Sequence, residues 1–175
     1  MLFRSVAFTG LPPRIDEDRL KAMGAAAAST GAVGLFHIEG VTPEKFERPR
    51  EALKLSGAML HAARDRLSTV RARTGDRVDA IAVGSPHFSF GEFQRLLAAL
   101  GGRKPAIPIY VCTGRHTLSE VERAGLDVSA LTIVADTCIV VTPILPAQGG
   151  VLLTNSGKFA HYTRPNTGYE VLYGS

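Results

Sequence analysis

The chain has few of the residues that mark a disulfide-stabilised, membrane-spanning or nucleic-acid-binding protein. It has two cysteines and no tryptophan among 175 residues. Two cysteines do not make the framework of a small secreted domain, so a reducing cytoplasm is the expected location. Apolar runs such as Ile139–Val141 have the length of strands, far below the ~20 residues of a membrane-spanning helix. Met1–Ser5 lacks the apolar core of a signal peptide, and we expect no membrane partner.

Positive charge is present but scattered. The formal net charge is +4, and most of the basic excess lies between Lys45 and Arg73, interspersed with acidic residues. Such a mixture is typical of a solvated helix face. Nucleic-acid binding would require a continuous basic stripe with aromatic residues for stacking, and the sequence contains neither. We therefore expect no nucleic-acid partner.

The composition is that of a folded, globular chain. Hydrophobic residues make up 45% and charged residues 21%, which excludes an intrinsically disordered protein. A chain of this length buries roughly 70% of the surface that its unfolded form exposes, enough for a core without disulfides. No repeat, low-complexity tract or linker divides the sequence. We expect residues 1–175 to form a single α/β lobe.

Strand and helix patterns alternate through the first half. Ser5–Thr9 and Val33–Ile38 have the pattern of strands. Asp16 is a suitable N-cap for a helix running to about Thr30. Thr42 and Pro43 predict the start of a second, long helix that continues toward Arg73, since apolar residues keep helical spacing along it.

The alternation continues through the second half. Ser89–Glu92 is a capping box flanked by apolar residues, and its helix is expected to end at Gly101. A second capping box, Thr117–Glu120, predicts a helix ending at Gly125. The expected strands are Val78–Val83, Ile107–Cys112, Leu131–Val134, Ile139–Thr142, Val151–Thr154 and Tyr169–Tyr173. Strands alternating with helices predict a three-layer α/β/α fold with a mostly parallel sheet.

Polar residues follow four consecutive predicted strands. In open α/β sheets, ligands bind just beyond the carboxyl ends of the strands. The residues at these positions are Ser85 and His87, then Thr113, Arg115 and His116, then Asp136 and Cys138, and finally Asn155, Ser156, Lys158 and His161. Together they form a plausible site for a small anion.

Each of these positions also has a purely structural interpretation. Ser85 with Pro86 is also explained as a turn, and Arg115 could pair with Glu120 or Glu122. Asn155–Lys158 could be a hairpin turn, and it does not fit a phosphate-binding P-loop, because the earlier glycine of that motif is missing. By composition alone, Cys138 is more often a small buried residue than a ligand, and Cys112 lies within a strand pattern.

Taken together, five segments resemble a known family. They are 28–44, Gly84–His87, Thr113–Arg115, Ala135–Cys138 and Thr154–Tyr162, and each is similar to a segment of the aconitase X catalytic subunit. They occur in the family's order, and the resemblance extends from about Arg19 to Ser175.

The resemblance implies an aconitase-like dehydratase. Known members eliminate water from cis-3-hydroxy-L-proline or from mevalonate 5-phosphate, using an iron–sulfur cluster, or iron, held by cysteines. Cys138 matches the cysteine of the family's Asp-Thr-Cys motif, a cluster ligand. Many relatives have Gly-Cys-Pro-His where this chain has Ser85, which removes one candidate ligand and favours the hydroxyproline branch. The alternatives are a mevalonate 5-phosphate dehydratase subunit, a non-catalytic α/β domain binding a small carboxylate or phosphate, and a purely structural subunit.

The expected substrate contacts follow from the chemistry of a hydroxy acid. Arg115 offers a bidentate fork to a carboxylate and Lys158 offers a point charge. The candidate substrate-binding residues are Ser85, His87, Thr113, Arg115, Asn155, Ser156 and Lys158, and no general base is assigned. The resemblance also implies a longer catalytic subunit and a small swivelling domain, fused or separate. We expect this chain to be a fragment that is inactive and holds no intact cluster by itself, since a cluster usually needs at least three protein ligands.

Overall fold

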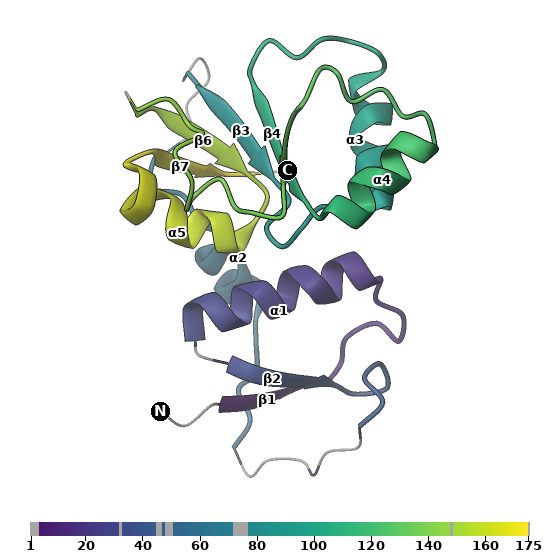
Figure 1. The fold of residues 1–175 in the computed structure, drawn as a ribbon. Helices are drawn as coiled ribbons and strands as arrows, with labels where there is room; N and C mark the ends of the chain where they lie inside the picture. Colours follow the sequence, from purple (N-terminus) through teal and green to yellow (C-terminus); the bar gives the residue numbers. More distant parts are fainter. Residues whose placement is uncertain are drawn as a thin grey trace. The chain divides into compact units, whose positions relative to one another are not determined.

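The computed structural model describes residues 4–31, 33–44, 47, 51–71, 77–147 and 149–174 (Figure 1). They form two compact units with the boundary between Ala63 and Arg64. Each unit has its own sheet, in place of the single lobe expected from the sequence. The two units are described separately below.

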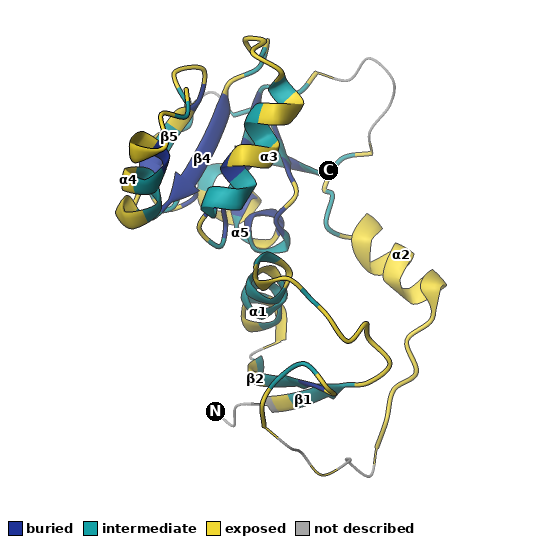
Figure 2. Ribbon diagram, turned by 90° about the vertical axis from the view of Figure 1, so that its right-hand side faces the viewer, coloured by how far each residue is buried: buried dark blue, intermediate teal, exposed yellow. Residues whose placement is uncertain are grey.

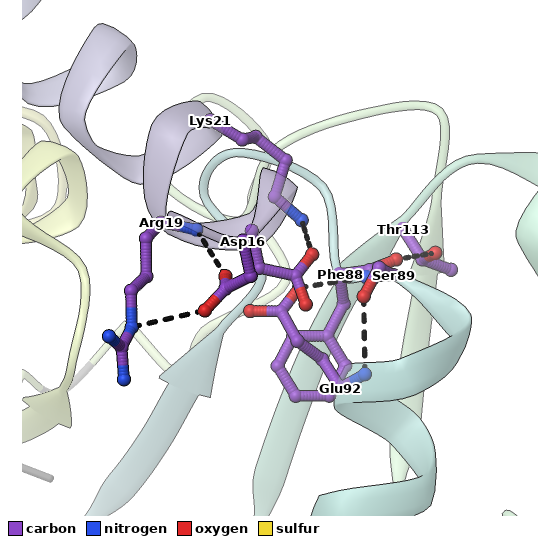
Figure 3. Close-up of polar contacts among 8 residues, drawn as sticks. Asp16, Arg19, Lys21, Phe88, Ser89, Glu92 and Thr113 are labelled. Carbon is purple, nitrogen blue, oxygen red and sulfur yellow. Dashed lines mark hydrogen bonds and ion pairs between the residues drawn. The ribbon is translucent and has the colours of Figure 1, made fainter. Parts of the chain in front are cut away.

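The first unit is a small strand–helix–strand motif. Strands β1 (Arg4–Phe8) and β2 (Val33–Ile38) pair in parallel, joined by helix α1 (Glu17–Gly31). Helix α1 packs closely on β2, because a Cβ at Gly24 would lie 3.3 Å from the Phe36 ring. The predicted N-cap is present: Asp16 Oδ1 accepts the Arg19 N–H at 2.9 Å (Figure 3).

The predicted long helix from Pro43 to Arg73 is wrong over the described residues. Helix α2 spans only Gly57–Asp65, and residues 45, 46, 48–50 and 72–76 lie outside the described part. The Thr42 hydroxyl accepts the N–H of Ile38 at 3.0 Å, which closes a turn and caps no helix. All of α2 is exposed (yellow in Figure 2). Most helices in proteins are stabilised by packing an apolar face against other elements, and the exposed residues of α2 lack such packing. Helical spacing of apolar residues was therefore not enough to form the longer helix.

The second unit contains a five-stranded sheet in which every pairing is parallel. The strands lie in the order β5-β4-β3-β6-β7. Their bounds are β3 (Ala80–Val83), β4 (Ile109–Thr113), β5 (Thr132–Ala135), β6 (Val151–Thr154) and β7 (Glu170–Tyr173). This sheet confirms the predicted α/β class.

Helices cover both faces of the sheet, which makes three layers. The helices are α3 (Phe90–Leu100), α4 (Arg115–Arg123) and α5 (Gly157–Thr167). Side chains of β4, which is buried throughout (Figure 2), alternate between two apolar clusters. Ile109 and Val111 join the cluster that contains Phe93 of α3 and Val121 of α4. Tyr110 and Cys112 join the cluster that contains Phe159 of α5. In the described part of the chain, no helix has the length and apolarity needed to cross a membrane.

The start of α3 has the predicted capping box. Ser89 Oγ accepts the Glu92 N–H at 3.1 Å, and Glu92 Oε2 accepts the Ser89 N–H at 2.8 Å (Figure 3). The rings of Phe88 and Phe93 lie edge to face with centroids 5.2 Å apart, as expected for the flanking apolar pair. The helix ends at Gly101, which adopts a left-handed conformation.

Two other local predictions are wrong, and one structural alternative is excluded. Helix α4 begins at Arg115 with Gly114 as its N-cap, so Thr117–Glu120 lies inside the helix and is not its cap. The predicted strand Ile139–Thr142 is a series of turns, whose first two side chains are buried in the core. Asn155–Lys158 leads into α5 and not into a hairpin.

Candidate functional site

The carboxyl ends of all five strands lie along one edge of the sheet, because every strand pair is parallel. Along the chain, β3, β4 and β5 progress toward one side, and β6 and β7 are then added on the other side of β3. In doubly wound sheets, the crevice at such a reversal is the usual ligand-binding position. Here the reversal lies between the loops that follow β3 and β6, and we call this position the switch point.

Two buried serines join the loops at the switch point. Ser156, at the end of the β6 loop, donates its hydroxyl hydrogen to the carbonyl oxygen of Ser85 in the β3 loop. The same Ser156 hydroxyl caps α5 by accepting the Phe159 N–H at 3.1 Å. The Ser156 backbone N–H donates to Thr154 Oγ1 at 3.1 Å. One hydroxyl thus fixes both the start of α5 and the distance between the two loops.

The loop after β3 lies directly against the end of β4. Gly84 has a φ of 90°, and a Cβ there would lie 2.0 Å from the Cys112 carbonyl oxygen. Only glycine fits this position. In the same loop, the peptide bond between Ser85 and Pro86 is cis. The exposed His87 then lies over the start of α4, since its Nδ1 is 3.6 Å from the position that a Cβ of Gly114 would occupy.

Thr113 stabilises this loop from inside. Its side chain is fully buried, and its hydroxyl donates to the Phe88 carbonyl oxygen at 2.8 Å (Figure 3). The Phe88 N–H in turn donates to the Cys112 carbonyl oxygen at 2.9 Å. The hydroxyl of this predicted substrate contact therefore points into the protein.

Arg115 pairs with Asp136, and not with the glutamates of its own helix. Asp136 Oδ1 accepts the Arg115 backbone N–H at 2.9 Å, and Oδ2 forms an ion pair with Arg115 Nε. The hydrogen bonds from Arg115, aided by the positive charge of its guanidinium, lower the pKa of Asp136. Sequence reasoning placed Asp136 at a strand end but did not identify this pairing, which joins residues 21 positions apart.

The predicted substrate-binding residues therefore fall into two groups along the edge. Around the switch point lie Ser85 on the loop after β3, Asn155 and Ser156 on the loop after β6, and Lys158 in the first turn of α5. His87 and Arg115, with Asp136, lie at the start of α4 beside the ends of β4 and β5. Asn155 is exposed and Lys158 is half-buried in the first turn of α5. Thr113 is buried beneath the second group, where its hydroxyl binds the Phe88 carbonyl oxygen and its own carbonyl oxygen accepts the Asp136 N–H.

The two cysteines have different environments. Cys112 is 1% exposed and belongs to the core. Burial raises the pKa of its thiol to about 11, partly offset by a hydrogen bond from the Ile139 N–H. Cys138 is half-buried and packs against the same apolar cluster. Within the described ranges, no three His, Cys, Asp or Glu side chains gather in a way that could hold a metal ion. These residues therefore do not fit a complete iron site by themselves.

This difference predicts unequal thiol reactivity. A thiol attacks reagents as the thiolate, so the buried Cys112, whose pKa is raised to about 11, should react much more slowly than the half-buried Cys138 near neutral pH. Folding raises the pKa of the Cys112 thiol, so the folded state is favoured while this thiol stays protonated. This contribution to the free energy of unfolding is present below pH 9.0 and is lost as the pH rises toward about 11. Timed thiol labelling of wild-type, Cys112→Ala and Cys138→Ser proteins measures both rates. Equal rates in the two single-cysteine variants would contradict the prediction.

By its fold and its strand-end loops, the second unit is a doubly wound parallel α/β domain. Domains of this class bind small ligands at a polar switch point like the one described here. Residues 78–175 match the family model described as the aconitase X third domain. Residues 4–65 match the aconitase X second domain. The chain belongs to the aconitase X family, as its motifs predicted, and the two matched regions correspond closely to the two structural units.

Named relatives and a solved structure agree with this assignment. The chain is 38% identical to the phosphomevalonate dehydratase large subunit of Methanothermobacter thermautotrophicus, over 95% of this chain and 42% of that protein. It is 33% identical to the cis-3-hydroxy-L-proline dehydratase of Pseudomonas aeruginosa, over 90% of this chain and 30% of that protein. It superposes on the holo-form crystal structure of Thermococcus kodakaraensis aconitase X with a TM-score of 0.81 and 28% identity, covering 97% of this chain and 44% of the other. The chain thus spans less than half the length of these relatives.

Proposed function

We propose that the complete protein containing this chain is a hydro-lyase, a dehydratase that removes water from a small hydroxy acid, and that the switch point forms part of its active site. The bond from Ser156 to Ser85 carries the proposal, because it fixes two polar loops where a doubly wound sheet binds its ligand. The relatives that share these domains are named as dehydratases.

The chemistry of dehydration suits the residues at this edge. The reaction removes a proton from the carbon next to a carboxylate and expels hydroxide. The substrate carboxylate therefore needs fixed hydrogen-bond donors and cations. Lys158 offers a positive charge and Asn155 an amide donor at the switch point. Arg115 offers the two terminal nitrogens of its guanidinium, since its Nε is engaged by Asp136. Ser85 and His87 are proposed to orient the substrate or its neighbours.

For the substrate, we propose cis-3-hydroxy-L-proline first. Ser85 stands where many relatives of the family have the cysteine of a Gly-Cys-Pro-His segment, and this departure favours the hydroxyproline branch. Mevalonate 5-phosphate is the second candidate, favoured by the 38% identity to a phosphomevalonate dehydratase subunit. Its phosphate would need further cations from the rest of the protein.

For the cofactor, we propose that Cys138 is one ligand of iron or an iron–sulfur cluster in the complete protein. The thiol is half-buried on the loop after β5, and the family resemblance matches it to a ligand position. Any further ligands would come from parts of the protein beyond the described residues. A small subunit or swivelling domain is the proposed partner, since several relatives are named large subunits, and the cytoplasm remains the proposed location.

The experiment uses the complete protein with its small subunit or domain, purified without oxygen. We expect it to convert one of the two hydroxy acids, detected as the dehydrated product, and to contain iron. Cys138→Ser should lose the iron and at least about 100-fold of the activity while keeping its circular dichroism spectrum. Cys112→Ala is the matched control and should keep the iron, because Cys112 is a core thiol.

Two results would count against these assignments. Iron-loaded wild-type protein that dehydrates neither compound would leave a non-catalytic, ligand-binding domain as the better explanation. Full retention of iron in Cys138→Ser would remove Cys138 from the metal site.

A further inference from the structure

We propose that Asp136 is a positioning residue: it holds the guanidinium of Arg115 so that its two terminal nitrogens face the substrate carboxylate. The inference rests on the proposed function and names the residue that makes the Arg115 contact possible. The two carboxylate oxygens of Asp136 bind two different groups of Arg115.

Each oxygen of Asp136 has a separate task. Oδ1 accepts the backbone N–H of Arg115 at 2.9 Å, so it caps α4 in the absence of a side-chain cap from Gly114. Oδ2 pairs with Arg115 Nε, the nitrogen inside the side chain. This side-on pairing leaves the two terminal nitrogens as a planar fork, the edge that binds a carboxylate in two parallel hydrogen bonds.

Asp136 can direct Arg115 because its own backbone is fixed. Its N–H donates to the Thr113 carbonyl oxygen at 2.8 Å, which ties the end of β5 to the end of β4. Its φ is 56°, a left-handed conformation that aspartate and asparagine adopt more readily than most residues. Thr113 is in turn buried and bonded to the Phe88 carbonyl.

Arg115 needs such a partner. Its side chain is 85% exposed, so without the ion pair it would sample many rotamers, and ordering it would weaken substrate binding. No local pattern of residues indicates this partner, because the glutamates of α4 are nearer along the chain.

The test compares Asp136→Asn with wild type in the complete enzyme. Asparagine tolerates the left-handed backbone and keeps an oxygen for the Arg115 N–H, but it loses the charge that holds Nε. We expect KM to rise about tenfold with kcat changed less than about threefold, since a charge-assisted contact to the substrate is weakened. The melting temperature should stay within a few degrees. Asp127→Asn is the matched control: Asp127 also accepts a nearby backbone N–H, at 2.9 Å from Ser129, but lies away from Arg115, and KM should not change.

A double-mutant cycle separates positioning from a general structural role. If Asp136 acts through Arg115, then Asp136→Asn should change kcat/KM less than about twofold in an Arg115→Ala background. Arg115→Lys should raise KM by a similar factor with Asp136 intact, because lysine makes a point contact and not a fork.

The outcomes are distinguishable. The inference would be overturned if the enzyme is active but Asp136→Asn leaves KM unchanged. It would also be overturned if Asp136→Asn lowers kcat/KM by the same factor with and without Arg115. In both cases the proposed function would stand. A wild-type enzyme that dehydrates neither hydroxy acid would overturn both.

Discussion

Gly84→Ala is expected to prevent stable folding of the unit that begins at Arg64. The new methyl group would lie 2.0 Å from the Cys112 carbonyl oxygen, a separation that real Cβ atoms do not adopt. The clashing atom belongs to the backbone of Cys112, so no side-chain rotation can relieve the contact. The φ of 90° adds strain of its own for any residue with a Cβ. We expect a loss of about 3 kcal/mol or more in the free energy of unfolding, or no soluble protein.

Gly102→Ala is the matched control for this effect. Gly102 also has a positive φ, 73°, but a Cβ there would meet nothing within 4 Å. It should cost only about 1 kcal/mol, the usual penalty for a left-handed conformation. Urea unfolding of the complete protein measures both variants. Equal costs would show that the β3 loop moves away from β4 easily, which contradicts a rigid switch point.

The strands and the family could be predicted from the sequence because their signals are local. Val33–Ile38 and Val151–Thr154 have the predicted bounds, since β-branched and apolar runs between turn residues mark buried parallel strands. The Ser89–Glu92 capping box is complete within four residues of chain, and it formed as predicted. The order of polar strand ends placed the candidate residues on one edge of the sheet.

The features that could not be predicted depend on contacts between distant residues. Helix α4 starts two residues before the predicted box because Asp136, from the next strand end, satisfies its first N–H. Helix α5 starts at what resembled a hairpin turn because Ser156 is held by Ser85 from 71 residues away. Ile139 and Val140 have the composition of a strand, but they serve as core side chains on a turn. In each case a tertiary contact outweighs the local pattern.

Ser156→Ala is expected to weaken both the fold and catalysis, because one hydroxyl makes two bonds at the switch point. Its loss removes the N-cap of α5, which costs about 1 kcal/mol. It also leaves the buried Ser85 carbonyl without its donor, which adds about 1–3 kcal/mol. The total expected loss in the free energy of unfolding is about 2–4 kcal/mol. In the complete enzyme, kcat/KM should fall at least about tenfold, since reacting groups must be held to within about an ångström.

Ser89→Ala and Ser156→Asp separate the two contributions. Ser89 caps α3 within its own capping box, so Ser89→Ala should cost only about 1 kcal/mol and leave kcat/KM unchanged. In Ser156→Asp, the carboxylate can accept the Phe159 N–H but cannot donate to Ser85. It should therefore restore the cap of α5, offset in part by the cost of burying a charge next to the Ser85 carbonyl, and it should not restore the activity. Urea unfolding and steady-state kinetics on the three variants give the comparison. Full activity in Ser156→Asp would show that helix capping alone organises the switch point, and that the bond between the two loops is dispensable.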